Sequence, residues 1–259
     1  MLEKQDFYLN KNVSRNIGKA ISDFSMIHKN DRIMVGLSGG KDSNLLLYAL
    51  CRLKSRSPVP FEIMALTVDP TDGKTDLDGL KDFTSSLNVS LDVTRYPIFD
   101  ILDNSPEKSS CSLCANIRRG ILASRSKELG CNVLALGHHR DDVIETVLLN
   151  LFYSGGFRCF HPNIHMSRSG IRVIRPLVYV SEWEIYKESQ RIGFPIVDFN
   201  CKHSSSSRRM LIKSQIEDLL KIAPDLPGNI IHALKHHKQE NTWVPGALEG
   251  SQQTGGHKR

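Results

Sequence analysis

The stretch that decides the fold is Ile33-Met34-Val35-Gly36-Leu37-Ser38-Gly39-Gly40-Lys41-Asp42-Ser43. Its first five residues form an apolar run that is typical of a buried strand, and a helix-forming run begins at Leu45. A strand, a glycine-rich turn and a helix in this order begin a βαβ unit.

The rest of the chain continues this alternation. Strands are predicted over residues 63–68, 89–93, 133–136 and 171–174, and helices over 77–87, 116–129 and 141–152. The pattern predicts an α/β fold, a doubly wound parallel sheet with helices on both faces. Helical periodicity over 11–28, a capping box from Ser181 to Glu184 and an apolar pattern over 210–222 predict three more helices.

The composition is that of a globular protein, since 40% of the 259 residues are hydrophobic and 24% are charged. A net charge of +6 suits a polyanionic partner without requiring one. Residues 1–6 are unlike a signal peptide, and no run approaches the roughly 18 apolar residues of a membrane span. We therefore expect a cytoplasmic protein with no membrane partner, whose cysteines are thiols or metal ligands.

The glycine turn has the chemistry of an anion cradle. Gly39 and Gly40 let backbone N–H groups close around a phosphate, and the following helix directs its positive end to the same place. Lys41 adds a mobile positive charge, while Ser38 and Ser43 add hydroxyl donors. The turn is not a Walker loop, because Asp42 follows the lysine where that pattern needs Ser or Thr.

Two further clusters carry reactive side chains. Cys111 and Cys114 have the spacing that lets both thiols bind one metal or cluster, with Cys159 and Cys201 as candidate partners. Asp141 and Asp142 follow a strand whose carboxyl end carries Gly137 and His138. These carboxylates suit Mg²⁺ or general-base work, although acids at a helix N-terminus are also favoured without any function.

Val35 through Ser43 resembles the PP-loop of the N-type ATP pyrophosphatases, which adenylate a substrate and release pyrophosphate. Over about residues 10–235 the chain resembles one group of these enzymes, the TtcA family of tRNA 2-thiocytidine synthetases. Four segments carry that resemblance: Ser38 to Ser43, Cys111 to Cys114 with Arg118 to Leu122, Gly137 to Asp142 with Asn150 and Phe152-Tyr153, and Ile174 to Leu177.

The resemblance implies ATP-dependent thiolation of cytidine 32 in the tRNA anticodon loop. It implies that Lys41 neutralises developing phosphate charge in catalysis, and that Asp42 and Asp142, with Asp141 as an alternative to Asp142, hold Mg²⁺ or act as general base. It places ATP on Ser38, Gly39, Gly40, Lys41, Asp42, Ser43, Val68, Gly137 and His138, and a [4Fe–4S] cluster on Cys111, Cys114 and Cys201. The implied partners are tRNA, a sulfur donor such as a cysteine desulfurase or free sulfide, and a second copy in a homodimer.

The third cluster ligand is where the chain departs from the family. The family usually shows Cys-x-x-Cys after its Phe-Pro-Ile segment, whereas this chain has Cys201 alone, with an apparent slip of one residue. His203 or Cys159 could contribute instead, or Cys111, Cys114, Cys201 and His203 could form a zinc site.

We expect four parts: an N-terminal amphipathic helix (1–30), an ATP-binding α/β domain (31–200), a C-terminal helical segment (201–248) and a disordered tail (249–259). Basic residues outside the site are either phosphate contacts or a solvated face; they are Lys11, Arg15, Lys19, Arg118, Arg119, Arg208 and Arg209.

Three alternative functions differ in what they require. A lysidine synthetase leaves the Cys111–Cys114 pair without a purpose, and a zinc-finger 2-thiouridine synthetase needs cysteine pairs near both ends of the chain. A non-catalytic nucleotide or iron–sulfur module predicts ATP binding without release of pyrophosphate.

Overall fold

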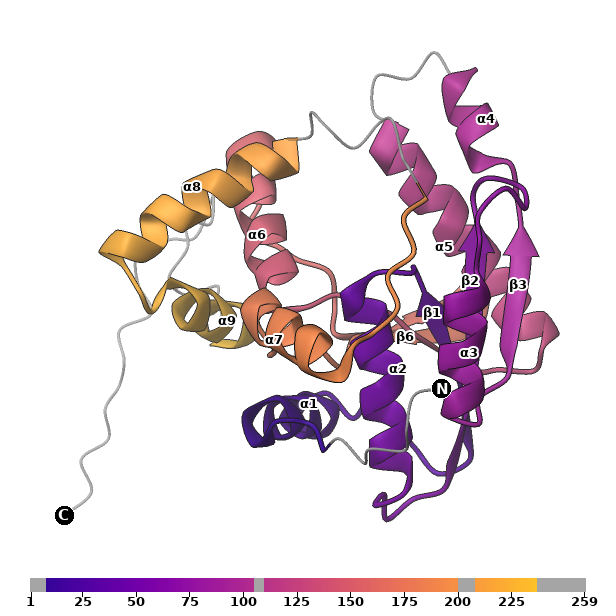
Figure 1. Cartoon of the computed structure of the whole chain (residues 1–259). Helices are drawn as coiled ribbons and strands as arrows, with labels where there is room; N and C mark the ends of the chain where they lie inside the picture. The colour runs from indigo at the N-terminus through magenta and orange to yellow at the C-terminus, as the bar shows by residue number, and fades with distance from the viewer. Residues whose placement is uncertain (1–7, 105–109, 200–207, 237–259) are drawn as a thin grey trace.

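A computed structural model describes residues 8–104, 110–199 and 208–236 of the chain, with the side chains of 110–112 excepted. A six-stranded sheet forms its centre, in the order β3-β2-β1-β4-β6-β5 (Figure 1). The strands are β1 Asp31–Leu37, β2 Phe61–Asp69, β3 Leu91–Arg95, β4 Val133–Ala135, β5 Asn163–Met166 and β6 Ile171–Ile174. All neighbours pair in parallel except β5, which runs antiparallel to β6 at the sheet edge.

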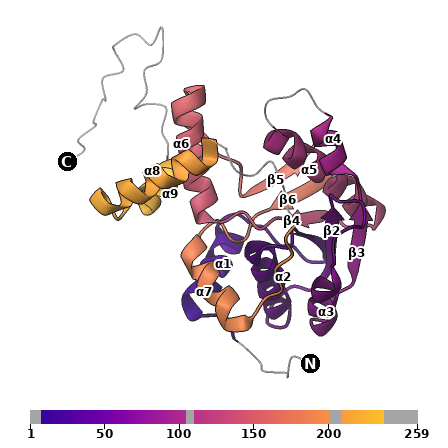
Figure 2. The same cartoon turned by 45° about the horizontal axis from the view of Figure 1, so that its top comes forward.

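Helices cover both faces of this sheet. They are α1 Lys11–Asp23, α2 Lys41–Lys54, α3 Asp78–Ser86, α4 Ile98–Asp103, α5 Ser110–Glu128, α6 Arg140–Ser154, α7 Glu182–Ile192, α8 Arg208–Ile222 and α9 Leu226–His236. Helices α1, α2, α3 and α7 pack with the largest apolar cluster, while α4 and α5 pack on the opposite face. Helices α6, α8 and α9 form a separate apolar cluster that lies to one side of the sheet (Figure 2).

The strand order places a binding crevice at one point. From β1 the chain moves through β2 to β3, and it then returns to the other side of β1 to form β4. Ligands of open α/β sheets bind where the order reverses in this way, outside the carboxyl ends of the strands. The glycine turn after Leu37 and the turn after Ala135 both lie at this crevice.

The predicted doubly wound sheet with helices on both faces is confirmed, with one addition. Strand β5 was not predicted, because its four residues are polar or exposed at an edge and alternate too briefly to give a signal. Helix α5 begins at Ser110 rather than at 116, and β3 lies two residues later than predicted. The proposed tail at 249–259 lies outside the described residues.

The helix predicted from its capping box forms as expected. The Ser181 side chain accepts a hydrogen bond from the backbone N–H of Glu184, and α7 ends at Gly193 in the left-handed conformation. No helix in the described part of the chain combines the length and the hydrophobicity that crossing a lipid bilayer requires.

Replacing Ile33 by alanine is expected to lower the free energy of unfolding by about 2–5 kcal/mol. The side chain is fully buried in the central strand, so its removal leaves a cavity. Urea denaturation measures the effect. The matched control is Ile222→Ala, since Ile222 is 84% exposed and its loss should cost less than about 0.5 kcal/mol. Equal losses for the two variants would contradict the packing described here.

Candidate active site

A cavity of about 290 Å³ lies at the crevice, above the carboxyl ends of β1, β2 and β4. We call it the nucleotide cavity, because the residues expected to bind ATP line it. Seven of the predicted site residues line it: Ser38, Asp42, Ser43, Val68, Gly137, His138 and Asp142. They come from four separate parts of the chain, so the fold brings together residues that the sequence only suggested were related. The remaining wall consists of Gly36, Leu37, Leu122, Leu136, Arg118 from α5 and Arg209 from α8.

The glycine turn is held by its own two serines. The Ser43 hydroxyl accepts a hydrogen bond from the Ser38 backbone N–H at 3.1 Å and donates one to the Gly40 carbonyl at 3.0 Å. The Ser38 hydroxyl lies 3.1 Å from the same Ser43 oxygen. These contacts fix the turn at the N-terminus of α2, where the helix dipole favours an anion.

Gly39 sits where no other residue fits. Its φ is +80°, and a Cβ added there would lie 2.8 Å from the Val197 Cβ. The segment 194–199, which we call the strap, causes this crowding. Its Val197 N–H donates to the Gly39 carbonyl at 3.0 Å, and the Asn44 side-chain amide donates to the Pro195 carbonyl at 2.6 Å.

Gly137 supports the turn from the opposite direction. A Cβ at Gly137 would lie 3.1 Å from the Ser43 backbone nitrogen and 3.2 Å from the Asp42 carbonyl carbon. The turn after β4 therefore touches the first turn of α2 backbone to backbone. Glycine is required here for close approach, a role distinct from the positive φ of Gly39.

Lys41 does not line the nucleotide cavity. Its ammonium contacts Glu182 at 3.2 Å and Asp42 at 3.3 Å. Burial alone would lower the pKa of Lys41, but these two carboxylates raise it above its ordinary value. The side chain faces a second cavity of about 430 Å³ between α6, α7 and α8.

The two neighbouring aspartates of α6 point to different places. Asp142 lines the nucleotide cavity, accepts a hydrogen bond from the His139 backbone N–H at 3.0 Å and lies 3.6 Å from Arg209. Asp141 faces the second cavity and accepts a hydrogen bond from the Glu182 backbone N–H at 2.8 Å. Of the two, Asp142 is positioned beside Asp42 at the nucleotide cavity.

His138 is half-buried in the cavity wall, and its pKa is strongly shifted. Burial, assisted by the positive charge of Arg175, lowers its pKa to about 4. Its ring packs against Phe160, and its buried Nδ1 has no hydrogen-bond partner among the described residues. Burial also lowers the pKa of Arg175 to about 10, while its guanidinium lies 4.9 Å from the Phe160 ring. His138 is thus a neutral imidazole at pH 7.

The described cysteines occupy different surroundings. Cys114 is half-buried on α5, beside the apolar cluster of Val68, Ile98 and Leu102. Cys131 is buried in the core, as expected of a small hydrophobe, and burial raises the pKa of Cys51 to about 11. Cys159 packs with α6, α8 and α9, and burial raises its pKa to about 11 as well, so its neighbours are not those of Cys114.

The strap connects the nucleotide cavity to the Cys114 helix. The Phe199 ring lies 3.4 Å from the position that a Cβ at Gly39 would take and 5.7 Å from the Arg118 guanidinium. Arg118 stands one helical turn after Cys114 on α5. Cys201 and His203 lie outside the described residues, as does the side chain of Cys111. Within the described residues, no group of three potential metal ligands occurs.

These surroundings fit a cluster held by thiolates. Cys114 offers a soft sulfur ligand at the edge of an apolar cluster, which limits the access of water. Cys111 lies one helical turn before Cys114 in α5. The last residue of the strap, Phe199, lies beside Arg118 of the same helix and precedes Cys201 by two residues in the sequence. The donor chemistry is that of iron–sulfur or zinc ligands.

Sequence reasoning did not identify Glu182 as a site residue. Glu182 binds Lys41 and also accepts from Lys213 at 2.6 Å, so it neutralises two lysines. The only signal was its place after the N-cap serine of α7, which indicates a helix start rather than a contact. Arg118 and Arg209, expected either as phosphate contacts or as part of a solvated face, line the nucleotide cavity.

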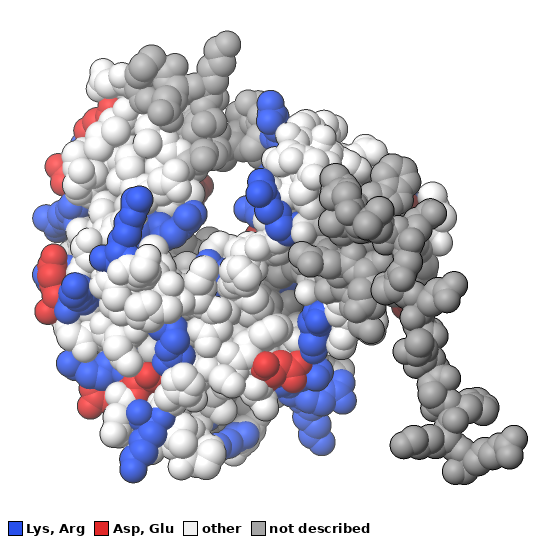
Figure 3. All heavy atoms as spheres, turned by 180° about the vertical axis from the view of Figure 1, so that it is seen from behind, with Lys and Arg blue, Asp and Glu red and all other residues white. Residues whose placement is uncertain are grey.

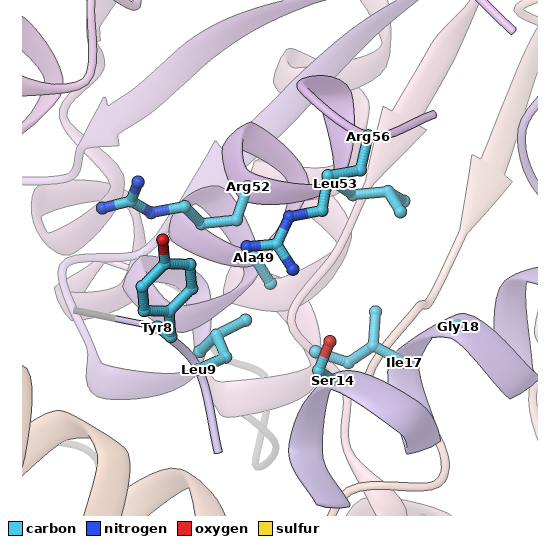
Figure 4. A pocket seen from close by; sticks show the side chains of 9 residues that line it. All are labelled: Tyr8, Leu9, Ser14, Ile17, Gly18, Ala49, Arg52, Leu53 and Arg56. Atoms are coloured by element: carbon cyan, nitrogen blue, oxygen red, sulfur yellow. The ribbon is translucent and has the colours of Figure 1, made fainter. Parts of the chain in front are cut away.

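A third cavity lies at the far end of α2 from the glycine turn. It holds about 80 Å³ between α1 and α2, and the Arg56 guanidinium lies 5.3 Å from the Tyr8 ring beside it (Figure 4). The Arg52 guanidinium donates to the Tyr48 hydroxyl at 3.0 Å. The cavity is small and shares no residue with the nucleotide cavity.

Replacing Gly39 by alanine is expected to weaken ATP binding about tenfold or more, because both the positive φ and the contact with Val197 force the turn to move. Isothermal titration with ATP measures the effect. The control is Gly155→Ala, since Gly155 also has a positive φ (+60°) but no atom within 4 Å of the added Cβ. If Gly155→Ala weakens ATP binding as much, the loss comes from backbone strain in general and not from the crowding of Gly39 by Val197.

Stability is expected to fall as the pH drops from about 6.5 toward 4. In this window the unfolded chain protonates His138 while the folded protein, with its pKa of about 4, does not. Because the unfolded state then binds more protons than the folded state, lowering the pH to 4 lowers the free energy of unfolding by roughly 3 kcal/mol. Urea denaturation across this range should show a shallower slope for His138→Gln. The exposed His165→Gln should keep the wild-type slope.

Comparison with known proteins agrees with this geometry. A family model described as a PP-loop domain matches residues 9–220. The chain is 37% identical over 238 residues to a tRNA-cytidine(32) 2-sulfurtransferase of Pelobacter propionicus, covering 90% of this chain and 88% of the relative. It is 39% identical to the protein of the same name from Vibrio vulnificus, covering 88% of this chain and 74% of that one.

Among solved structures, the fold is similar to that of the U34-tRNA thiolase NcsA from Methanococcus maripaludis, solved with its [4Fe-4S] cluster. The TM-score is 0.69 at 23% identity, over 87% of this chain and 77% of the other. That likeness shows the fold. The identity with the curated relatives over most of both chains shows the family: this chain is a PP-loop protein that belongs to the tRNA-cytidine(32) 2-sulfurtransferases.

Proposed function

We propose that this protein thiolates cytidine 32 of tRNA in an ATP-dependent reaction that yields 2-thiocytidine, AMP and pyrophosphate. Its family membership supports the reaction class. The observation that carries the proposal is the strap, which packs on the PP-loop at Gly39 and continues to Arg118, one turn from Cys114. A nucleotide site and a thiol-bearing helix are thereby joined by one fixed segment.

The first step is adenylation of the base. The C2 carbonyl oxygen of the cytidine attacks the α-phosphorus of ATP, and pyrophosphate leaves. Gly39 and Gly40 bind phosphate oxygens through backbone N–H groups at the start of α2, and the Ser38 and Ser43 hydroxyls exchange their contacts within the turn for phosphate oxygens. Val68 and Gly137 line the part of the cavity that receives the nucleoside.

Charged residues of the cavity then stabilise the transition state. Lys41 exchanges Glu182 for a phosphate oxygen and neutralises the negative charge that develops there. Asp42 and Asp142 would hold Mg²⁺, because both carboxylates line the cavity and Asp42 Oδ1 would exchange its 3.3 Å contact with Lys41 for the metal. His138, neutral at pH 7, accepts a hydrogen bond without adding charge. Asp141 positions α7 through Glu182.

The second step replaces oxygen by sulfur at C2, with AMP as the leaving group. Cys111, Cys114 and Cys201 would hold a [4Fe–4S] cluster, which supplies sulfur-transfer chemistry when bound. Arg118 lies between the cavity and this ligand set, and its guanidinium offsets the charge of the departing phosphate. The apolar cluster around Cys114 limits competing attack by water.

The partners follow from this scheme. The tRNA supplies the cytidine, and a cysteine desulfurase or free sulfide supplies the sulfur. The protein acts in the cytoplasm, where tRNA is found, and we propose a homodimer as its assembly. We retain the division into an N-terminal helix (1–30), a PP-loop domain (31–200) and a C-terminal helical segment (201–248).

Mass spectrometry of tRNA nucleosides tests the proposal. A strain lacking the protein should lose 2-thiocytidine, and the wild-type chain should restore it. Cys114→Ala should fail to restore it while retaining ATP binding in purified protein, because the thiol lies outside the nucleotide cavity. Cys131→Ala, in which a core cysteine is changed, should restore the base. Unchanged 2-thiocytidine in the deletion strain would contradict the proposed substrate.

A further inference from the structure

The C-terminal end of α6 presents aromatic side chains to solvent. Phe152 is 60% exposed, Tyr153 46% and Phe157 38%, with Leu151 beside them at 46%. We call these four residues the aromatic end. Clustered exposed aromatics on a protein surface mark a binding site more often than scattered ones do.

The aromatic end is held in place rather than left loose. The Asn150 side-chain amide donates to the Arg158 carbonyl at 3.0 Å, and the Gly156 N–H donates to the Asn150 carbonyl at 3.1 Å. Gly155 takes the left-handed conformation that ends the helix. The apolar packing of α6 against α8 and α9 involves Val147 and Leu148 instead, so the aromatic end is not needed for the core.

The charge around the aromatic end is positive. The Arg208 guanidinium lies 4.8 Å from the Tyr153 ring, and Arg158 is exposed next to Phe157. From Thr146 to Ser181 the sequence contains no Asp or Glu. Figure 3 shows Lys and Arg side chains on both sides of the hollow in the molecule.

Helix α8 links the aromatic end to the active site. Arg208 faces Tyr153, while the next residue, Arg209, contacts Glu145 at 2.7 Å and lines the nucleotide cavity. One turn of α8 therefore touches both places. A ligand on the aromatic end would therefore lie beside the turn of α8 that also reaches the nucleotide cavity.

We propose that the aromatic end binds unpaired bases of the tRNA loop by stacking, with Arg208 and Arg158 contacting the adjoining phosphates. This inference rests on the proposed function and assigns the surface that holds its substrate. Aromatic rings flanked by arginines, without nearby acids, are the means by which proteins grip single-stranded nucleic acid. A second copy of the chain fits less well, because a symmetric contact would bring the same arginines face to face.

Binding of a tRNA transcript to the full-length protein, measured by fluorescence anisotropy at several salt concentrations, tests the inference. Phe152→Leu should weaken binding about tenfold with an unchanged salt slope, since stacking is lost and charge is kept. Phe152→Tyr should retain wild-type affinity. Arg208→Gln should weaken binding and reduce the salt slope by about 1.

The matched control is Trp183→Leu on α7. Trp183 is 61% exposed and stacks on Tyr186, so it equals Phe152 in exposure, but Glu182 and Glu184 flank it in the sequence. This variant should bind tRNA like the wild type. All variants should keep their melting temperature and their affinity for ATP, because the changed side chains are exposed and none lines the nucleotide cavity.

The outcomes separate this inference from the proposed function. If the wild type binds and thiolates tRNA while Phe152→Leu binds equally well, the aromatic end is not the RNA surface. A change of oligomeric state in Phe152→Leu on sedimentation, with unchanged RNA affinity, would assign the surface to a second copy and overturn the inference. If the wild type binds no tRNA, the proposed function itself fails.

Discussion

The close approach of the strap to the PP-loop is the constraint on which the site depends. Three backbone segments meet there: the turn at Gly39, the strap at Val197 and the turn after β4 at Gly137. None of them is stable alone as a short loop, but each contact removes conformational freedom from the others. Because a Cβ at position 39 would come closer to Val197 than real Cβ atoms do, and one at 137 would crowd the backbone of Ser43, glycine at both positions favours the arrangement. The cavity walls and the Cys114 helix are therefore held in one fixed relation.

Electrostatic pairing completes the arrangement around the second cavity. Glu182 accepts from Lys41 and Lys213, and its backbone N–H donates to Asp141. The first turns of α2, α6 and α7 are thus tied to α8 through one residue, Glu182. The pairing keeps the PP-loop lysine neutralised before a nucleotide arrives, so phosphate must compete with Glu182 for it. A residue that the sequence marked only as a helix start therefore tunes the charge of the anion site.

The sequence was sufficient to predict the parallel sheet and most of the residues that meet at the cavity, because those features rest on local patterns. Apolar strands, the glycine turn and the acids after β4 each produce a signal within a few residues, and the family resemblance set them in order. The contacts of Glu182, Arg118 and Arg209 could not be predicted, since they depend on where α5, α7 and α8 lie in space. The separation of Asp141 from Asp142 likewise follows from the rotation of α6 about its axis, which neighbouring positions in a sequence do not reveal. Strand β5 and the exposed aromatic residues at the end of α6 could be recognised only in the structure. They depend on which strand lies at the sheet edge and on which side chains reach the surface.

The register of the strap bears on the one departure from the family pattern. Phe199 is buried against Gly39 and Arg118, so the chain is fixed at that residue, one helical turn from Cys114 along α5. Cys201, two residues further along the chain, lies outside the described residues. The described course of the strap therefore ends at a residue that contacts both the PP-loop and the Cys114 helix.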